Sequence, residues 1–173
     1  MPMYDQKTTE QFIQMKVTGL TIDPFTSMPI IILKDLQDKC ALPIWIGLIE
    51  ASAIATELER IPLARPMTHD LMKNMLDALG VKVAKVEVHD LSDNTFFARL
   101  TLVHQAKDLV MDARPSDAIA VALRTGAPIF VAKKVIDKSR KIDLADETQG
   151  ARTQKWTEIL ENLSPDDFGK YKM

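Results

Sequence analysis

Several features are scarce or missing in this sequence, and each absence excludes a class of protein. Among its 173 residues there is one cysteine, Cys40, which rules out a disulfide within the chain and a zinc site built on cysteine pairs. No apolar run approaches the roughly 20 residues that a membrane-spanning helix needs. The first residues lack the basic-then-apolar order of a signal peptide. We therefore expect a cytoplasmic protein with no membrane segment.

Positive charge and the common catalytic motifs are also scarce. The net charge is −2, which argues against a protein that coats nucleic acid through bulk positive charge. A nucleic-acid substrate would need a local basic patch or bound cations. The glycine-rich phosphate loops, the His-Glu-x-x-His zinc motif and the Gly-x-Ser-x-Gly nucleophile turn do not occur.

The apolar residues that are present predict a mixed α/β (α+β) fold, with a largely antiparallel sheet and three or more helices packed on it. We expect strands at 12–22, 28–36, 40–46, 81–91, 95–103, 109–113 and 128–132. The first three should form an antiparallel meander. Helices are expected at 47–60, from Thr68 to a stop at Gly80, and at 117–125.

The same pass along the chain predicts one domain with a C-terminal helix. We expect a flexible N-terminus at 1–11, the domain at 12–138, a mobile connector at 139–152, and a C-terminal helix with a short tail at 153–173. Small side chains in the 47–60 helix would let a neighbouring element approach closely, either within the domain or in another copy of the chain.

One stretch, Asp112–Ala120, places several polar groups at a strand-to-helix junction. Arg114 precedes a proline, which favours an extended backbone there. Ser116 suits a helix N-cap, and Asp117 suits the first turn, where a carboxylate meets the positive end of the helix dipole. Gly126 suits the C-terminal stop.

A similar stretch occurs earlier, at Ala64–Asp70, where Ala-Arg-Pro again precedes a hydroxyl residue and an acid. Here Thr68 would cap the helix, and Met67 and Met72 would form a hydrophobic staple around it.

These two junctions allow two interpretations. In the first they form a phosphate site, because a helix N-terminus offers free N–H donors and an arginine offers a fork matched to phosphate. In the second they are structural, with Thr68 and Ser116 as caps and each arginine paired with a nearby aspartate. Asp70 and Asp117 would compete with an anion, unless the acids hold a divalent cation that itself binds phosphate.

Other polar residues are equally open to two interpretations. His69 can exchange protons near neutral pH, or it is a surface histidine at a helix start. Glu50 is a third acid of a cation site, or it faces the dipole of its own helix. The basic cluster Lys133–Lys141 follows a nucleic-acid backbone, or it is a solvated face.

Three blocks of sequence carry a resemblance to a known family. They are Leu42–Gly47 followed by Glu50-Ala51, then Arg65–Leu71, then Asp112–Ala120. In this order they resemble the bifunctional nuclease family, formerly a domain of unknown function, some members of which are credited with DNase and RNase activity. The resemblance runs from about residue 12 to residue 137. It implies a mixed α/β domain that forms homodimers or larger homo-oligomers.

The resemblance implies that shared polar positions form a site, and the nuclease hypothesis assigns their roles. The catalytic candidates are His69, Asp70, Asp112 and Asp117. The substrate-binding candidates are Arg65, Thr68, Arg114, Ser116, Lys133 and Lys134. The candidate ligands of Mg²⁺ or Mn²⁺ are Glu50, Asp70, Asp112 and Asp117.

The alternative hypothesis is a non-catalytic module that binds an anion or nucleic acid, or acts in regulation. The positions of Arg65 and Arg114 discriminate between the two. If both arginines were buried and bound to aspartates, with no hollow nearby, the structural role would be favoured. An open groove beside Lys133–Lys141 would favour the nuclease.

Overall fold

The computed structural model describes residues 10–139 of the chain. Its strands are β1 (Phe12–Ile22), β2 (Pro29–Asp35), β3 (Ala41–Trp45), β4 (Lys82–Ser92), β5 (Thr95–His104), β6 (Lys107–Ala113) and β7 (Ile129–Ala132). Its helices are α1 (Leu48–Leu58), α2 (Thr68–Ala78), α3 (Pro115–Thr125) and α4 (Lys133–Lys138). The strands form one seven-stranded sheet in the order β3-β2-β1-β7-β4-β5-β6.

The sheet is mixed and largely antiparallel, so the predicted fold class is confirmed. β1, β2 and β3 form the expected antiparallel meander. β7 lies between β1, to which it is antiparallel, and β4, to which it is parallel. This central position of a four-residue strand joins the two halves of the sheet.

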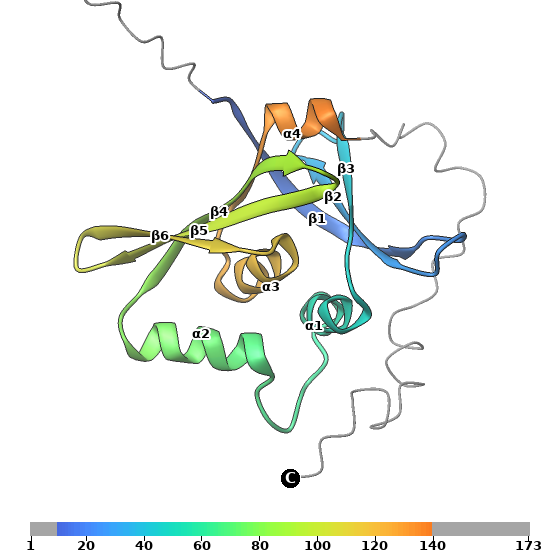
Figure 1. Cartoon of the computed structure of the whole chain (residues 1–173). Coiled ribbons are helices and arrows are strands. Elements are labelled where there is room, and N and C mark those ends of the chain that lie inside the picture. Colours follow the sequence, from blue (N-terminus) through green and yellow to red (C-terminus); the bar gives the residue numbers. More distant parts are fainter. Residues whose placement is uncertain (1–9, 140–173) are drawn as a thin grey trace, which may run out of the picture.

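The helices are distributed unequally about the sheet. α1, α2 and α3 lie on one side, with α1 and α3 next to the strands, and α4 lies beyond the opposite side (Figure 1). The core forms between the sheet and the inner pair of helices, and includes Ile31, Leu42, Ile54 and Ile119. The small side chains of α1 are buried within the domain, where α1 packs on α3. The small side chains of α1 therefore allow α3 to approach closely, and a second copy of the chain is not needed to explain them.

Both helix caps predicted at the junctions are wrong by one or two positions. The N-cap of α3 is Arg114, and Ser116 lies inside the helix, because Pro115 has a backbone suited to the first helical position. The N-cap of α2 is Met67, with Thr68 as the first helical residue, so the expected staple is also displaced. The stop at Gly126 is confirmed, with a φ of 69° in the left-handed region.

Other differences concern the basic cluster and the apolar stripe of α2. Residues 133–138 form α4, a short helix that the sequence did not predict. The apolar side chains of α2 are mostly exposed, and its buried residue is His69. No helix in the described part of the chain is long and apolar enough to cross a membrane. The C-terminal helix and the chain before residue 10 lie outside the described residues, and the predicted domain limits stay predictions.

Candidate functional site

The helices α1, α2 and α3 share one feature at their N-termini. Each carries an acid as its third helical residue, namely Glu50, Asp70 and Asp117. A carboxylate at this position faces the positive end of the helix dipole, which the sequence predicts for Asp117 and offers as one of two interpretations for Glu50. The helices bring Glu50 and Asp117 to a single arginine, whereas Asp70 binds a different one.

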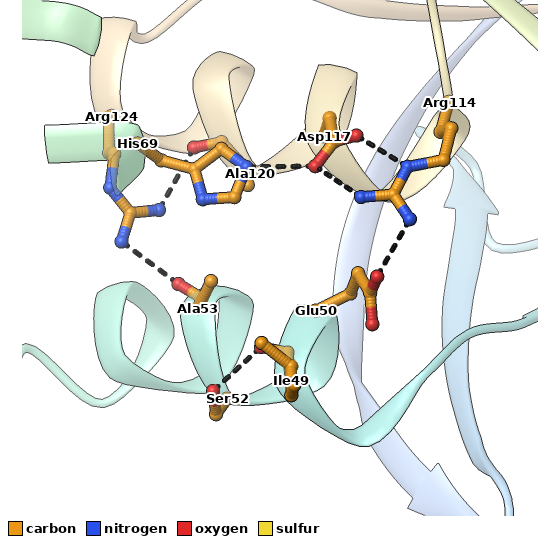
Figure 2. Close-up of polar contacts among 9 residues, drawn as sticks. All are labelled: Ile49, Glu50, Ser52, Ala53, His69, Arg114, Asp117, Ala120 and Arg124. Atoms are coloured by element: carbon orange, nitrogen blue, oxygen red, sulfur yellow. Dashed lines mark hydrogen bonds and ion pairs between the residues drawn. The ribbon is translucent and has the colours of Figure 1, made fainter. Parts of the chain in front are cut away.

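That single arginine is Arg114, which connects α1 to α3. Its Nε and Nη2 donate to the two carboxylate oxygens of Asp117 at 2.7 and 3.2 Å, and its Nη1 donates to Oε1 of Glu50 at 2.8 Å. Asp117 Oδ1 also lies 3.0 Å from Nε2 of His69 on α2. Figure 2 shows the four side chains in a row, running from His69 through Asp117 and Arg114 to Glu50.

Exposure changes along this row. The His69 residue is 9% exposed, whereas the Arg114 side chain is 64% exposed. Burial alone would raise the pKa of Asp117, but the hydrogen bonds from Arg114 and His69 outweigh it and hold the pKa below the usual range. The hydrogen bonds to Asp117 and Glu50 raise the pKa of Arg114. The row therefore presents a fixed, permanently charged guanidinium to solvent.

Glu50 is held against the start of its own helix. A Cβ added to Gly47, the N-cap of α1, would overlap Oε2 of Glu50. Gly47 has an ordinary extended backbone, with a φ of −74°, so space rather than backbone conformation calls for glycine here. The carboxylate can reach Arg114 in this position because residue 47 has no side chain.

Arg114 and Glu50 line an open hollow of about 280 Å³. Ser116, buried at the second position of α3, lines the same hollow. Trp45 at the end of β3 and Phe96 on β5 also line it. A phosphate-sized anion could reach Arg114 from this hollow.

Sequence reasoning missed a second arginine, Arg124, whose side chain is 3% exposed. Its Nε donates to Asp70 Oδ1 at 2.5 Å, and its Nη1 and Nη2 donate to the carbonyls of Ala120 and Ala53, both at 3.0 Å. Arg124 therefore ties α1, α2 and α3 together, and Figure 2 shows it at the other end of the row. The available signal was a lone cation in the apolar helix at 117–125.

Asp70 has a structural role in this arrangement. Its Oδ2 accepts the backbone N–H of Met67 at 2.8 Å, which satisfies one free donor at the start of α2. Burial acts to raise its pKa, but the bonds from Arg124 and Met67 outweigh this and lower the pKa. Asp70 thus binds Arg124 and the start of its own helix, and not Arg114.

The remaining predicted residues are spread over the molecule. Arg65 is exposed and lines a separate hollow of about 290 Å³ together with Asp70 and Arg124. Thr68 is exposed at the start of α2, and Asp112 is exposed on β6. On α4, Lys133 is exposed and Lys134 is 2.6 Å from Glu10 and 3.8 Å from Asp90.

The positions of Arg65 and Arg114 fit neither the structural nor the nuclease alternative in full. Arg114 lines an open hollow and is paired with Asp117 at the same time. Arg65 lines a different hollow, so the two Ala-Arg-Pro stretches do not form one composite site in the described residues.

Comparison with known proteins bears on this arrangement. The family model described as the bifunctional nuclease domain matches residues 31–143, which include Glu50, His69, Arg114 and Asp117. The chain belongs to the bifunctional nuclease domain family. An uncharacterized protein of Mycobacterium tuberculosis is 37% identical over 162 residues, which is 90% of this chain and 97% of that protein.

Two plant members carry the family name as their own. Bifunctional nuclease 1 of Arabidopsis thaliana is 34% identical over 120 residues, covering 66% of this chain and 37% of the plant protein. Bifunctional nuclease 2 of the same plant is 32% identical over 126 residues, covering 68% and 38%. The similarity therefore spans less than half of each plant protein.

Within this bifunctional nuclease domain, the four acids predicted to bind a metal do not fit as one site. Among residues 10–139, no group of three or more histidine, cysteine, aspartate or glutamate side chains is placed to hold a metal ion. Glu50 and Asp117 are bridged by Arg114, while Asp70 binds Arg124 and Asp112 lies on β6. The four acids therefore take part in separate interactions and do not converge on one point.

Proposed function

We propose that this protein hydrolyses phosphodiester bonds in DNA or RNA, at the hollow lined by Glu50 and Arg114. Membership of the bifunctional nuclease domain family supports a nuclease-like function. The observation that carries the choice of site is the exposed guanidinium of Arg114, fixed between the starts of α1 and α3. It is the one sequence-predicted arginine that faces a hollow shared with a carboxylate, a hydroxyl and aromatic rings among the described residues.

Arg114 binds the phosphate in this proposal. A guanidinium has five N–H donors, and Glu50 and Asp117 use three of those on Arg114. The other two have no partner among the described residues and are free to donate to phosphate oxygens. Because Asp117 holds the guanidinium through two bonds, Arg114 stabilises the negative charge on the non-bridging phosphate oxygens in the transition state without moving to do so.

Glu50 acts as the general base. Its Oε1 accepts from Arg114, while its Oε2 lies beside Gly47 and accepts no hydrogen bond from the described residues, so Oε2 is the atom that takes the proton in this proposal. A water molecule attacks phosphorus, the bond from phosphorus to the leaving oxygen breaks, and the proton of the attacking water passes to Glu50. The leaving oxygen takes its proton from solvent.

His69 and Asp117 are positioning residues in this account. His69 is nearly buried, and its Nε2 is engaged with Asp117, so it orients the carboxylate that holds Arg114. This differs from the direct catalytic role that the sequence suggested for the pair. Asp70 and Asp112 receive no chemical role here.

A comparison of two arginine variants tests the proposal. Arg65 and Arg114 are both exposed and both precede a proline, but only Arg114 lies beside Glu50. We expect Arg114→Lys to lower the rate of oligonucleotide hydrolysis by about 100-fold, the usual cost of losing one charge-stabilising donor, and Arg65→Lys to keep the rate. Equal rates for wild type and Arg114→Lys would place the reaction elsewhere.

The dependence on Mg²⁺ or Mn²⁺ stays a prediction, and the same assay addresses it. Hydrolysis of single- and double-stranded DNA and RNA is measured with either ion and with EDTA. Loss of activity in EDTA would mean that an ion binds with the substrate, since the acids do not assemble a site by themselves.

A second candidate function is a non-catalytic module that binds an anion or nucleic acid. The favouring observation is that Glu50 and Asp117 already balance the charge of Arg114. In that case Arg114 mainly joins α1 to α3. Purified protein would then bind an oligonucleotide without cleaving it, and Arg114→Lys would lower the free energy of unfolding rather than a rate.

A further inference from the structure

A longer groove extends from the Arg114 hollow towards α4. A second hollow, of about 480 Å³, is lined by Pro43, Leu91, Lys138 and Ser139. It shares Trp45, Asn94 and Phe96 with the hollow at Arg114. The two hollows therefore adjoin at these three residues, and we call the pair the groove, with Lys138 at one end and Arg114 at the other.

The curvature of the sheet creates this groove. Three strands, β2, β1 and β7, lie between β3 and β4 in the sheet order. Nevertheless Trp45 at the end of β3 lines the same hollows as the β4–β5 hairpin. The turn of that hairpin is Asp93-Asn94, and both residues have a positive φ, as a tight two-residue turn requires. Asn94 is thereby fixed at the edge of the groove.

Trp45 presents an aromatic surface in the middle of the groove. Its residue exposure is 46%, whereas its neighbours Ile44 and Ile46 are buried. Its Nε1 donates to Oδ2 of Asp23 at 2.9 Å, which fixes the orientation of the indole ring. A large apolar ring that is half exposed and held in place by a hydrogen bond is a surface on which a flat ligand can stack.

Phe96 supplies a second ring, and two cations stand at the ends. Phe96 is half-buried, packs against the core and lines both hollows. The ammonium of Lys138 donates to the carbonyl of Leu91 at 3.2 Å and lies 3.6 Å from a carboxylate oxygen of Asp90. The Lys138 side chain is otherwise exposed. An ammonium has three donors, so Lys138 can also bind an anion.

We propose that this groove binds a single strand of nucleic acid, with bases stacked on Trp45 and Phe96 and backbone phosphates bound at Arg114 and Lys138. The inference rests on the proposed function, because the strand would deliver its phosphodiester bond to the Glu50–Arg114 end. Aromatic rings that alternate with cations along a groove are the usual means of holding unpaired bases.

A duplex does not fit this arrangement of groups. In a duplex the base faces are stacked on one another, so they cannot reach rings that lie within a groove between β3 and the β4–β5 hairpin. An unpaired strand can turn its bases towards the rings while its phosphates stay at the cations. The acids beside both cations weaken purely electrostatic binding, so the stacking contacts should decide the affinity.

Binding measurements on the full chain test this inference. The probe is a fluorescently labelled phosphorothioate oligothymidylate of about ten nucleotides, which resists hydrolysis, and its blunt duplex is the comparison. We expect the single strand to bind more tightly than the duplex. Trp45→Ala should weaken single-strand binding roughly 5- to 150-fold, the range expected for the loss of one stacked base.

Two further variants separate stacking from damage to the fold. Trp45→Phe keeps a ring and should retain affinity within about threefold of wild type. Phe97→Ala is the matched control, because Phe97 is exposed, adjoins Phe96 in β5 and points to the opposite face of the sheet. It should leave affinity unchanged. Thermal unfolding of each variant shows whether the fold is intact.

The outcomes separate this inference from the proposed function. Wild-type affinity in Trp45→Ala, equal loss in Phe97→Ala, or tighter binding of the duplex would overturn the inference, even if the protein hydrolyses nucleic acid. Single-strand binding that depends on Trp45 but comes without hydrolysis would support the inference and remove the proposed function. Binding of an apolar peptide in place of the oligonucleotide would also overturn it.

Discussion

At the scale of single residues, the site depends on a few side chains that have little room to move. Arg114 donates three hydrogen bonds to acids on two helices, and the carboxylate of Glu50 lies against Gly47. The side chains of Arg114 and Glu50 nevertheless remain in contact with solvent. Small changes in geometry at this point should therefore affect chemistry more than stability.

Gly47→Ala tests this geometry without changing a charge. The new Cβ overlaps Oε2 of Glu50, so the flexible carboxylate must move, which disturbs the contact of its Oε1 with Arg114. We expect hydrolysis to slow by about tenfold or more, with little change in the midpoint of thermal unfolding. Gly19→Ala is the matched control, because a Cβ at Gly19 meets nothing within 4 Å. Equal rates for both variants would show that the position of Glu50 does not matter.

Arg124→Lys should instead destabilise the fold. Lysine cannot reproduce the planar set of bonds to Asp70 and to the two helix carbonyls, so buried acceptors lose their partners. We expect the free energy of unfolding to fall by about 3 kcal/mol, measured by chemical denaturation. Arg60→Lys, at an exposed position after α1, serves as control. An unchanged free energy of unfolding in Arg124→Lys would mean that this arginine does not hold the helices together.

At the scale of elements, the helix N-termini explain why acids recur at the junctions. The sequence predicted α1, α2 and α3, acids at their starts, and the arginines that precede Pro66 and Pro115, because dipole and proline preferences are local. It could not predict which acid meets which arginine. Arg114 and Glu50 are 64 residues apart, and His69 and Asp117 are 48 apart, so their contacts depend on how α1, α2 and α3 pack. The helix at 133–138 was missed because its basic residues suggested a solvated segment.

These helix-start acids predict a loss of stability in acid. The folded-state pKa values of Asp70 and Asp117 lie below the usual aspartate value of 3.8. Their contribution is therefore complete above that value and is lost as the pH falls through the lowered pKa values. Denaturation curves at successive pH values should show the free energy of unfolding falling in this range. Asp70→Asn should reduce the slope, whereas Asp112→Asn, at an exposed position on β6, should not. An unchanged slope in Asp70→Asn would contradict this account.

At the scale of the whole molecule, one apolar surface has no cover within the described residues. It consists of the exposed side chains of Leu71, Met72 and Met75 on α2 and of Leu79, the C-cap of that helix. An isolated helix of 11 residues is marginal in water, and α2 packs on α3 mainly through its first turn. The homo-oligomer that the family resemblance implies would cover this surface.

Met75→Glu tests that assembly. A charge in the middle of the α2 surface should convert an oligomer into a monomer, which light scattering coupled to size exclusion detects. Asn74→Glu changes a neighbouring exposed position outside the apolar stripe and should leave the mass unchanged. A wild-type chain that is already monomeric at micromolar concentration would refute the prediction.

The central claim is that phosphodiester hydrolysis depends on the carboxylate of Glu50 beside Arg114. The most direct measurement is the single-turnover rate of oligonucleotide hydrolysis by wild type and by Glu50→Gln, purified in parallel. Glutamine keeps the size of the side chain and an oxygen for Arg114, but it cannot take a proton from water. The account predicts a rate lower by about 100-fold or more in Glu50→Gln, with an unchanged unfolding midpoint. Equal rates in the two proteins would contradict it.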